Sequence, residues 1–323
     1  MSIIMPKEAY YTIIAGATRF ANQKIPFDDW IEAYGIFTGK LEGKKKNTKL
    51  IITNAIPIMH QEKNPDDIVD RLHWKEEDYA SIEMIENENF EKNEFIVGWW
   101  HSHPGFKVML SGFGDRQTTL SYQTEYNPLG FALVFNPERL VRQIEKPNKK
   151  GDPDIKLKSD PGFKIFRFDD ISKGPKGTYH EVQDYVIEGF NSREEMIVQA
   201  QKLVIDITKH LPSENIVETY EREIENAIQQ LQASLLGTDE YLQTLIRKGE
   251  SSRVPEVLEK QKTEIRNNVK NTNDKVEKLK NFTLYLEYKE REIIIPQINT
   301  IFARWDETIS KLDNTLAALS KKF

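Results

Sequence analysis

Apolar residues at helical spacing open the chain and predict an amphipathic helix over residues 9–22. A second helix is predicted to carry Trp30, Ile31, Tyr34 and Gly35. The stretch 34–58 overlaps the end of this second helix. It predicts two strands around a polar turn of Gly and Lys, because enrichment in Ile and Thr favours an extended chain. The chain therefore begins with mixed helix and strand signals.

Residues 75–190 continue this mixture. A helix is predicted over 75–87, and the apolar run that ends in "VGWWHSH" has the character of a buried strand. A helical segment over 116–126, directly after Asp115, leads into the strand "GFALVFNP". Further strands are predicted in "FKIFRFDD" and "TYHEVQDYVIEG". Short connections between such elements indicate an α+β domain.

The pattern changes at Ser192, where a capping box with Glu195 precedes an apolar helical run. We therefore expect two domains, 1–190 and 191–323, the second all-α with helical or coiled-coil character. One helix is predicted over 193–210 and another from Ser213. Narrow apolar stripes follow at spacings of three and four: Val217, Tyr220, Ile224, Ile228, Leu231 and Leu235, then Leu258, Ile265, Val269, Val276 and Leu279, then Ile298, Ile301, Trp305, Ile309, Leu312, Leu316 and Leu319. Such helices bundle within the chain or pair with helices of another chain.

Composition narrows the class of protein. With 323 residues the chain is long enough for two domains, and no apolar run approaches the roughly 18 residues of a membrane span. The amino terminus lacks the basic and apolar segments of a signal peptide, so we expect a cytoplasmic protein. The net charge of −6 argues against a nucleic-acid binder, and the basic run 44–46 is interpreted as a solvated turn. Since cysteine is absent, any metal must be held by His, Asp or Glu.

The candidate chemistry lies in "VGWWHSHPGFKVMLSGFGD", residues 97–115. Side chains alternate along a strand, so His101 and His103 project to the same side. Pro104 then ends the strand, and the following loop can bring Asp115 round as a third ligand at the start of a helix. Two histidines and one carboxylate leave a coordination position open, which is the pattern of catalytic rather than structural zinc.

A metal hydrolase also needs a proton acceptor and a donor for the oxyanion. Ser111, four residues before Asp115, is the candidate donor. The proton acceptor is an acidic residue from elsewhere in the chain, and composition alone does not select it among so many Asp and Glu.

This stretch resembles the JAMM motif of the MPN-domain zinc metalloproteases, H-x-H-x7-S-x2-D, and is most similar to the proteasome-lid deubiquitinase subunit and the signalosome isopeptidase subunit. The resemblance spans about residues 9–189. It implies a mixed β-sheet flanked by helices, similar to cytidine deaminases, with Zn²⁺ held by His101, His103 and Asp115. It also implies Glu32, in "EAYGIFTGKL", as the catalytic proton shuttle and Ser111 as the oxyanion donor.

The spacing departs from the family pattern at one point. Three residues, Gly112, Phe113 and Gly114, separate Ser111 from Asp115 where the family has two. Either the loop bulges or the site is broken. Because glycine reaches backbone angles that other residues avoid, and because all five required side chains are present, we expect zinc binding to be intact.

The resemblance implies an isopeptidase that cleaves between a ubiquitin or ubiquitin-like carboxyl terminus and a substrate lysine, within a proteasome-lid-like complex. Polar segments 61–71 and 145–162 resemble the family's variable inserts, and we expect them to frame the groove for the modifier's tail. Expected partners are modifier conjugates, another MPN domain and helical-bundle subunits. The alternatives are a non-catalytic MPN scaffold, or a JAMM hydrolase that acts on a modifier other than ubiquitin.

Overall fold

The structure is a computed structural model that describes residues 2–43, 48–61, 75–141, 160–210 and 216–322. The chain divides into two compact units. The first unit comprises Met1–Pro212 and Leu284–Glu290, and the second comprises Ser213–Thr283 and Arg291–Phe323.

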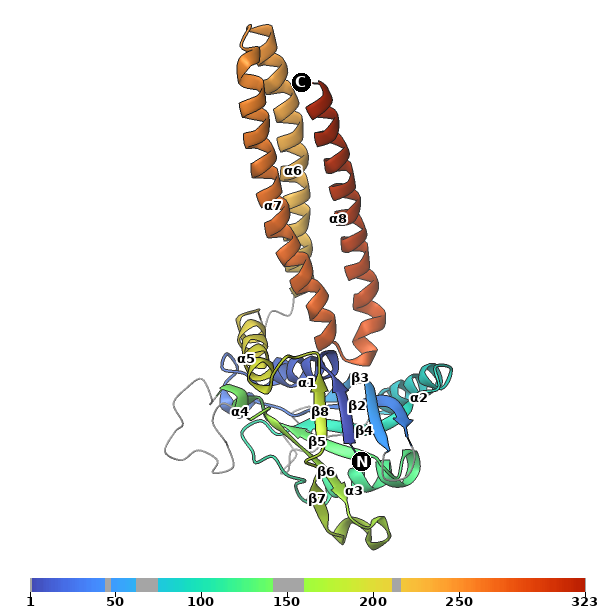
Figure 1. Cartoon of the computed structure of the whole chain (residues 1–323). Helices are drawn as coiled ribbons and strands as arrows, with labels where there is room; N and C mark the ends of the chain where they lie inside the picture. Colours follow the sequence, from blue (N-terminus) through green and yellow to red (C-terminus); the bar gives the residue numbers. More distant parts are fainter. Residues whose placement is uncertain (1, 44–47, 62–74, 142–159, 211–215, 323) are drawn as a thin grey trace. The chain divides into compact units, whose positions relative to one another are not determined.

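The described strands of the first unit form one eight-stranded sheet with the order β7-β6-β5-β4-β2-β3-β1-β8 (Figure 1). The strands are β1 (Ser2–Pro6), β2 (Ala33–Glu42), β3 (Lys49–His60), β4 (Phe95–Ser102), β5 (Phe131–Phe135), β6 (Phe163–Phe168), β7 (Tyr179–Glu181) and β8 (Tyr185–Glu188). The sheet is mixed, because β1 pairs in parallel with β3 and β8, whereas β2 pairs antiparallel with β3.

Strand β4 lies inside this sheet and carries the end of the candidate motif. It pairs antiparallel with β2, where His101 lies opposite Tyr34, and in parallel with β5, where His101 lies opposite Val134. Both sides of the strand are therefore hydrogen-bonded up to its last residues. A side chain at the end of β4 is held by two neighbouring strands.

Two apolar cores cover the two faces of the sheet, and neighbouring residues of β4 alternate between them. Trp100 packs in the core beneath α1 (Lys7–Phe20) and α5 (Arg193–His210). Trp99 packs in the other core, beneath α2 (Glu76–Phe90). Both indole rings are fully buried. The remaining described helices of this unit are α3 (Gly114–Ser121), α4 (Pro137–Val141), the short 3-10 helices η1 (Phe27–Asp29) and η4 (Ile171–Lys176), and the π-turn η3 (Tyr122–Tyr126).

Most predicted elements of the first unit appear, with one error. The helices predicted over 9–22 and 75–87 correspond to α1 and α2. The helix predicted around Trp30 is wrong, because only the 3-10 turn η1 forms there and β2 begins at Ala33. The spacing of four between Trp30 and Tyr34 suggested a helix. Pairing with β3 and β4 on both sides instead holds this segment extended.

The first unit extends beyond the boundary predicted at residue 190. Helix α5 contributes Met196, Ile197, Ala200 and Val204 to the core that it shares with α1, so it packs as part of the sheet unit. The polar segments predicted to frame a groove, 61–71 and 145–162, lie mostly outside the described residues, as does the basic run 44–46.

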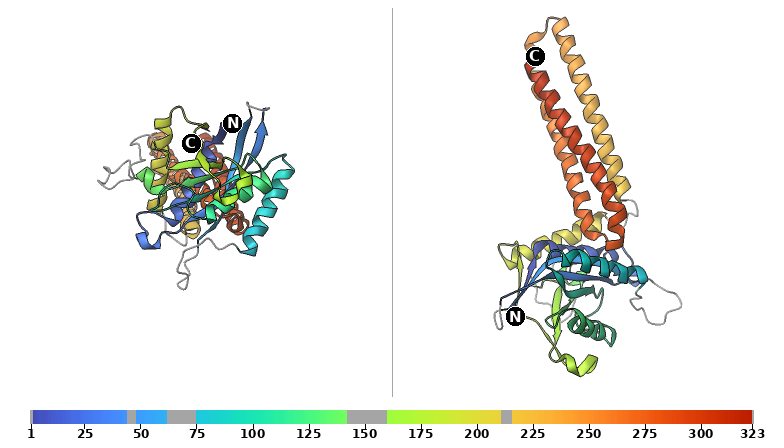
Figure 2. Two further views of the ribbon diagram at one scale, coloured as in Figure 1. Left: turned by 90° about the horizontal axis from the view of Figure 1, so that it is seen from below. Right: turned by 90° about the vertical axis from the view of Figure 1, so that its right-hand side faces the viewer.

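The second unit is helical, as predicted. Its long helices are α6 (Ile216–Arg247), α7 (Val254–Phe282) and α8 (Tyr288–Lys322), with 3-10 turns η5 (Ser251–Arg253) and η6 (Thr283–Tyr285). They run side by side (Figures 1 and 2). Buried positions on the predicted stripes include Tyr220, Ile224, Ile228, Leu231, Leu258, Ile265, Leu279, Ile298, Ile301, Trp305, Leu312 and Leu319.

Polar contacts also join these three helices. The indole N–H of Trp305 on α8 donates to Asn273 Oδ1 on α7 at 2.8 Å. Lys275 on α7 pairs with Glu223 on α6 at 2.9 Å. The stripes therefore meet one another within the chain, and the fold is an α+β domain followed by a helical region. In the part of the chain that the structure describes, no helix has the length and apolar character required to span a bilayer.

Candidate metal centre

Two buried histidines stand at the end of β4. Because side chains alternate along the strand, His101 and His103 lie on the same side, and their Nε2 atoms are 2.9 Å apart. His101 is wholly buried, and its ring stacks on Trp99 with a centroid distance of 4.4 Å. The backbone N–H of His103 donates to Phe135 O at 2.7 Å, which extends the pairing with β5 past the last strand residue. Both rings are thus placed by the sheet itself.

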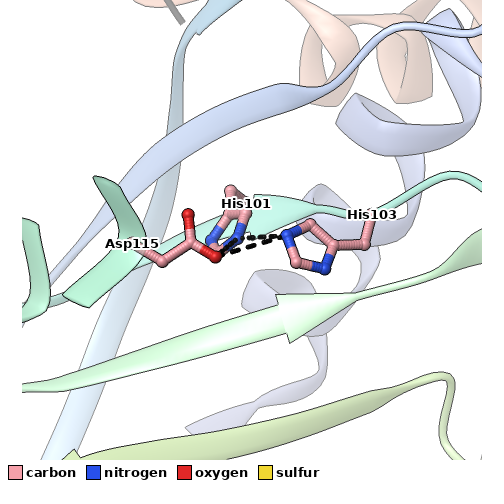
Figure 3. Close-up of side chains that lie close together, drawn as sticks. All are labelled: His101, His103 and Asp115. Carbon is pink, nitrogen blue, oxygen red and sulfur yellow. Dashed lines mark hydrogen bonds and ion pairs between the residues drawn. The ribbon is translucent and has the colours of Figure 1, made fainter. Parts of the chain in front are cut away.

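The third member of the cluster, Asp115, comes from the first turn of α3. Its Oδ2 atom lies 3.3 Å from His101 Nε2 and 3.4 Å from His103 Nε2, and Figure 3 shows the carboxylate pointing at both rings. Asp115 therefore reaches the histidines despite the extra residue after Ser111. Of the two alternatives, the geometry corresponds to a bulged loop.

The bulge is built from Ser111 and Gly112. Gly112 has φ +48°, in the left-handed region where glycine is favoured. The backbone N–H and the hydroxyl of Ser111 both donate to Asp115 Oδ2, at 2.6 and 2.8 Å. The extra residue is absorbed where the backbone turns, and Ser111 holds the carboxylate oxygen that faces the histidines.

The three donor atoms have the spacing that a metal ion needs. Tetrahedral ligands at about 2.0–2.1 Å from an ion lie roughly 3.3 Å from one another. The three atoms here are separated by 2.9, 3.3 and 3.4 Å. His103 Nδ1 donates to Lys107 O at 2.9 Å, so Nε2 is the ring nitrogen that faces the cluster and is placed to ligate an ion. His101, His103 and Asp115 could therefore hold a metal ion together.

Electrostatics within the cluster favour a cation. Burial alone would lower the pKa of His103, but its hydrogen bond to Asp115 and the nearby carboxylate of Glu32 outweigh burial and raise that pKa. Burial likewise opposes ionisation of Asp115, yet His101 and His103 hold the pKa of its carboxyl well below its usual range. The carboxylate stays ionised, and positive charge is stabilised beside it.

Glu32 and Ser111 were predicted from the family resemblance, and both lie at this cluster. Glu32 immediately precedes β2, and its Oε1 atom is 3.9 Å from His103 Nε2. Its carbonyl accepts a hydrogen bond from Gln61 N–H at 2.8 Å, which fixes the backbone there. The side chain is about one-quarter exposed, so a carboxylate and solvent can meet at the edge of the cluster.

Trp99 and the Lys107 carbonyl also shape the site, although neither belongs to the sequence motif. Period-two alternation in "WWHSH" places Trp99 on the same side of the strand as His101, so a signal for the ring stacking was present. No sequence signal identifies the Lys107 carbonyl, because the position of a backbone oxygen depends on how the loop closes.

Comparison with known proteins agrees with this geometry. Residues 1–128 match the family model described as JAB1/Mov34/MPN/PAD-1 ubiquitin protease. The amino-terminal region is therefore similar to JAB/MPN domains. The match covers β1 to α3, and so includes Glu32, Ser111 and the three residues of the metal cluster.

Part of this chain is also similar to subunit 5 of the COP9 signalosome complex from several organisms. Identity is 31% over 119 residues with the Neurospora crassa protein, covering 35% of this chain and 31% of the relative. It is 32% over 113 residues with the Oryza sativa protein, covering 34% and 28%. It is 30% over 112 residues with the Drosophila melanogaster protein, covering 34% and 31%. The aligned part thus spans about a third of the length of these relatives.

Proposed function

We propose that this chain is a zinc-dependent isopeptidase that hydrolyses the bond between the carboxyl terminus of ubiquitin, or a ubiquitin-like modifier, and a substrate lysine. The observation that carries the proposal is the meeting of His101, His103 and Asp115 with Glu32 at their edge, inside a JAB/MPN domain. The donor set of two imidazoles and one carboxylate is that of catalytic zinc sites.

In this proposal His101, His103 and Asp115 hold the zinc ion. The ion supplies a Lewis acid that lowers the pKa of water towards neutrality. Glu32 accepts a proton from the attacking water and delivers it to the lysine Nζ as the C–N bond breaks, so no net proton is consumed at the carboxylate. When substrate binds, the Ser111 hydroxyl would turn its one proton from Asp115 Oδ2 to the oxygen that develops negative charge, while the backbone N–H of Ser111 keeps its hydrogen bond to Asp115.

Zinc content tests the metal site. We expect about one zinc per chain in the purified protein, with zinc lost in H103A and D115N. His180 offers a matched control, because it also pairs with an aspartate, at 2.7 Å from Asp169, but lies on the exposed strand β7. H180A should keep its zinc. Absence of zinc from the wild-type protein after reconstitution would reject the metallohydrolase.

The E32Q substitution tests the chemistry separately. It should keep zinc, because Glu32 is not among the three ligands, and reduce kcat on a ubiquitin–lysine conjugate by roughly 10²- to 10⁴-fold, the contribution of a positioned proton-transfer group. Parallel assays on conjugates of other modifiers and on short acyl-amides identify the substrate class. Full activity of E32Q would assign proton transfer to another residue.

A non-catalytic scaffold is the second candidate function, and the helical unit favours it. Large apolar side chains are exposed on its helices: Leu236, Tyr241, Ile246 and Ile293. Such side chains are available to other subunits. We propose a cytoplasmic multiprotein complex of the signalosome or proteasome-lid kind, with another MPN domain and helical subunits as partners. Assembly without zinc would favour the scaffold over the enzyme.

A further inference from the structure

The turn that follows β4 determines which nitrogen of His103 faces the cluster. Phe106 N–H donates to His103 O at 3.2 Å, which closes the turn over Pro104 and Gly105. The next residue, Lys107, presents its carbonyl to His103 Nδ1 at 2.9 Å. This carbonyl accepts a hydrogen bond from Nδ1–H and so orients the ring with Nε2 towards Asp115. Whatever holds this turn also holds the imidazole.

Asn136 holds the turn from the neighbouring strand. It directly follows β5, and its Nδ2 donates to Phe106 O at 2.8 Å. Its Oδ1 accepts the Glu138 N–H at 2.9 Å, so Asn136 also caps α4, whose first residue is Pro137. One side-chain amide therefore joins the start of a helix to the peptide group immediately before the Lys107 carbonyl.

Asn136 is itself fixed by a buried network. Its backbone N–H donates to Gly162 O at 2.8 Å, and Gly162 N–H donates to Asp160 Oδ1 at 2.8 Å. The other oxygen of Asp160 accepts hydrogen bonds from Arg139 on α4, including one from Nε at 3.0 Å. Asn136, Arg139 and Asp160 are all buried, so the amide cannot easily turn away from Phe106.

We propose that Asn136 is a positioning residue that sets the orientation of the His103 ring through the Phe106–Lys107 peptide. Its side-chain amide serves both contacts with separate atoms, because Oδ1 accepts from the helix cap and Nδ2 donates to the Phe106 carbonyl. An aspartate in its place would keep the cap and turn a negative charge towards that carbonyl. The effect on zinc rests on the function proposed above, whereas the effect on the imidazole does not.

The experiment compares N136D and N136S with wild type. Asp and Ser both keep an acceptor for the α4 cap while the amide donor to Phe106 O is lost. The thermal midpoint should fall in both variants, and more in N136D, which places a buried charge against that carbonyl, so their folding is checked first by circular dichroism. We expect zinc affinity, measured by competition with a chelator, to fall roughly tenfold, as for outer-shell partners of metal ligands. In the metal-free protein, NMR should show faster exchange of the His103 Nδ1–H proton with water in both variants, because its hydrogen bond to Lys107 O is loosened.

Asn127 provides the matched control at the other end of β5. It is equally buried, and its Oδ1 accepts the Leu129 N–H at 3.0 Å. N127D should leave zinc affinity and the exchange of the His103 Nδ1–H proton unchanged. Wild-type affinity and exchange in both Asn136 variants would overturn the proposal, as would equal losses in N127D. If wild type took up no zinc, the proposed function would fail, while the NMR comparison would still decide the role of Asn136. N136S retains the test if N136D does not fold.

Discussion

The metal cluster has two halves that the protein holds in different ways. His101 and His103 belong to a strand half, where both rings are buried and β2 and β5 fix the backbone on either side. Ser111 and Asp115 belong to a loop half, in which the contacts that define Asp115 come from a residue four positions away. The strand half is specified by the fold of the whole domain, and the loop half by local hydrogen bonds.

This difference explains where an extra residue could be accommodated. One residue inserted into β4 would move every following side chain to the opposite face of the sheet and separate His101 from its partner. One residue inserted beside Gly112 changes only a surface turn, since nothing lies within 4 Å of a Cβ placed there. The turn of the loop half can therefore lengthen by one residue without moving the histidines.

The largest expected effect comes from removing one ligand from each half. H101A and D115N should each weaken zinc binding by more than the roughly 100-fold caused by outer-shell changes. Their effects on folding should differ. H101A removes a fully buried ring stacked on Trp99 and should cost about 2 kcal/mol of unfolding free energy. D115N keeps an oxygen for Ser111 to bond and loses only the charge that the two histidines stabilise, so it should cost less unfolding free energy than H101A.

Zinc titration and denaturant unfolding of both variants check this contrast. The unfolding measurements are made on metal-free protein, so that loss of zinc does not itself appear as loss of stability. Equal destabilisation by H101A and D115N would show that the loop half contributes as much to the unfolding free energy as the strand half.

A smaller effect is expected from S111A, which removes one of the two hydrogen bonds that hold Asp115. The backbone N–H of residue 111 still donates to Oδ2, so we expect zinc affinity to fall roughly tenfold rather than vanish. Ser172 offers a matched control, because its N–H and hydroxyl both donate to Asp170 Oδ1 far along the chain. S172A should bind zinc like wild type. Unchanged affinity in S111A would remove Ser111 from the positioning of Asp115.

The strand half was predictable from sequence because it follows from a short-range rule. Alternation along β4 placed His101 and His103 together, and the same three-and-four spacing located the stripes of the helical unit. Glu32 could not be selected from the residues alone. It meets His103 only after β2 pairs with β4, and many other carboxylates have the same chemistry. The proposed role of Asn136 could not be predicted from sequence for the same reason, because its hydrogen bond to Phe106 joins residues 30 positions apart.

The loop half was the least predictable part, since two outcomes fitted the spacing between Ser111 and Asp115. Sequence could identify glycine as the residue able to absorb the extra position. It could not show which glycine would do so, because that depends on the path of the turn between the end of β4 and the start of α3. The structure assigns the left-handed conformation to Gly112.

The smallest expected effect separates Gly112 from Gly114. An alanine at Gly112 meets no neighbouring atom but must adopt φ near +48°, which costs about 1–2 kcal/mol for a residue with a Cβ. Gly114 also has open space, and it begins α3 without a positive φ. G112A should therefore weaken zinc binding a few-fold, whereas G114A should match wild type. Equal losses of zinc affinity in the two variants would contradict this assignment. They would mean that the absence of a side chain at both positions, rather than the backbone freedom of Gly112, allows Asp115 to reach the histidines.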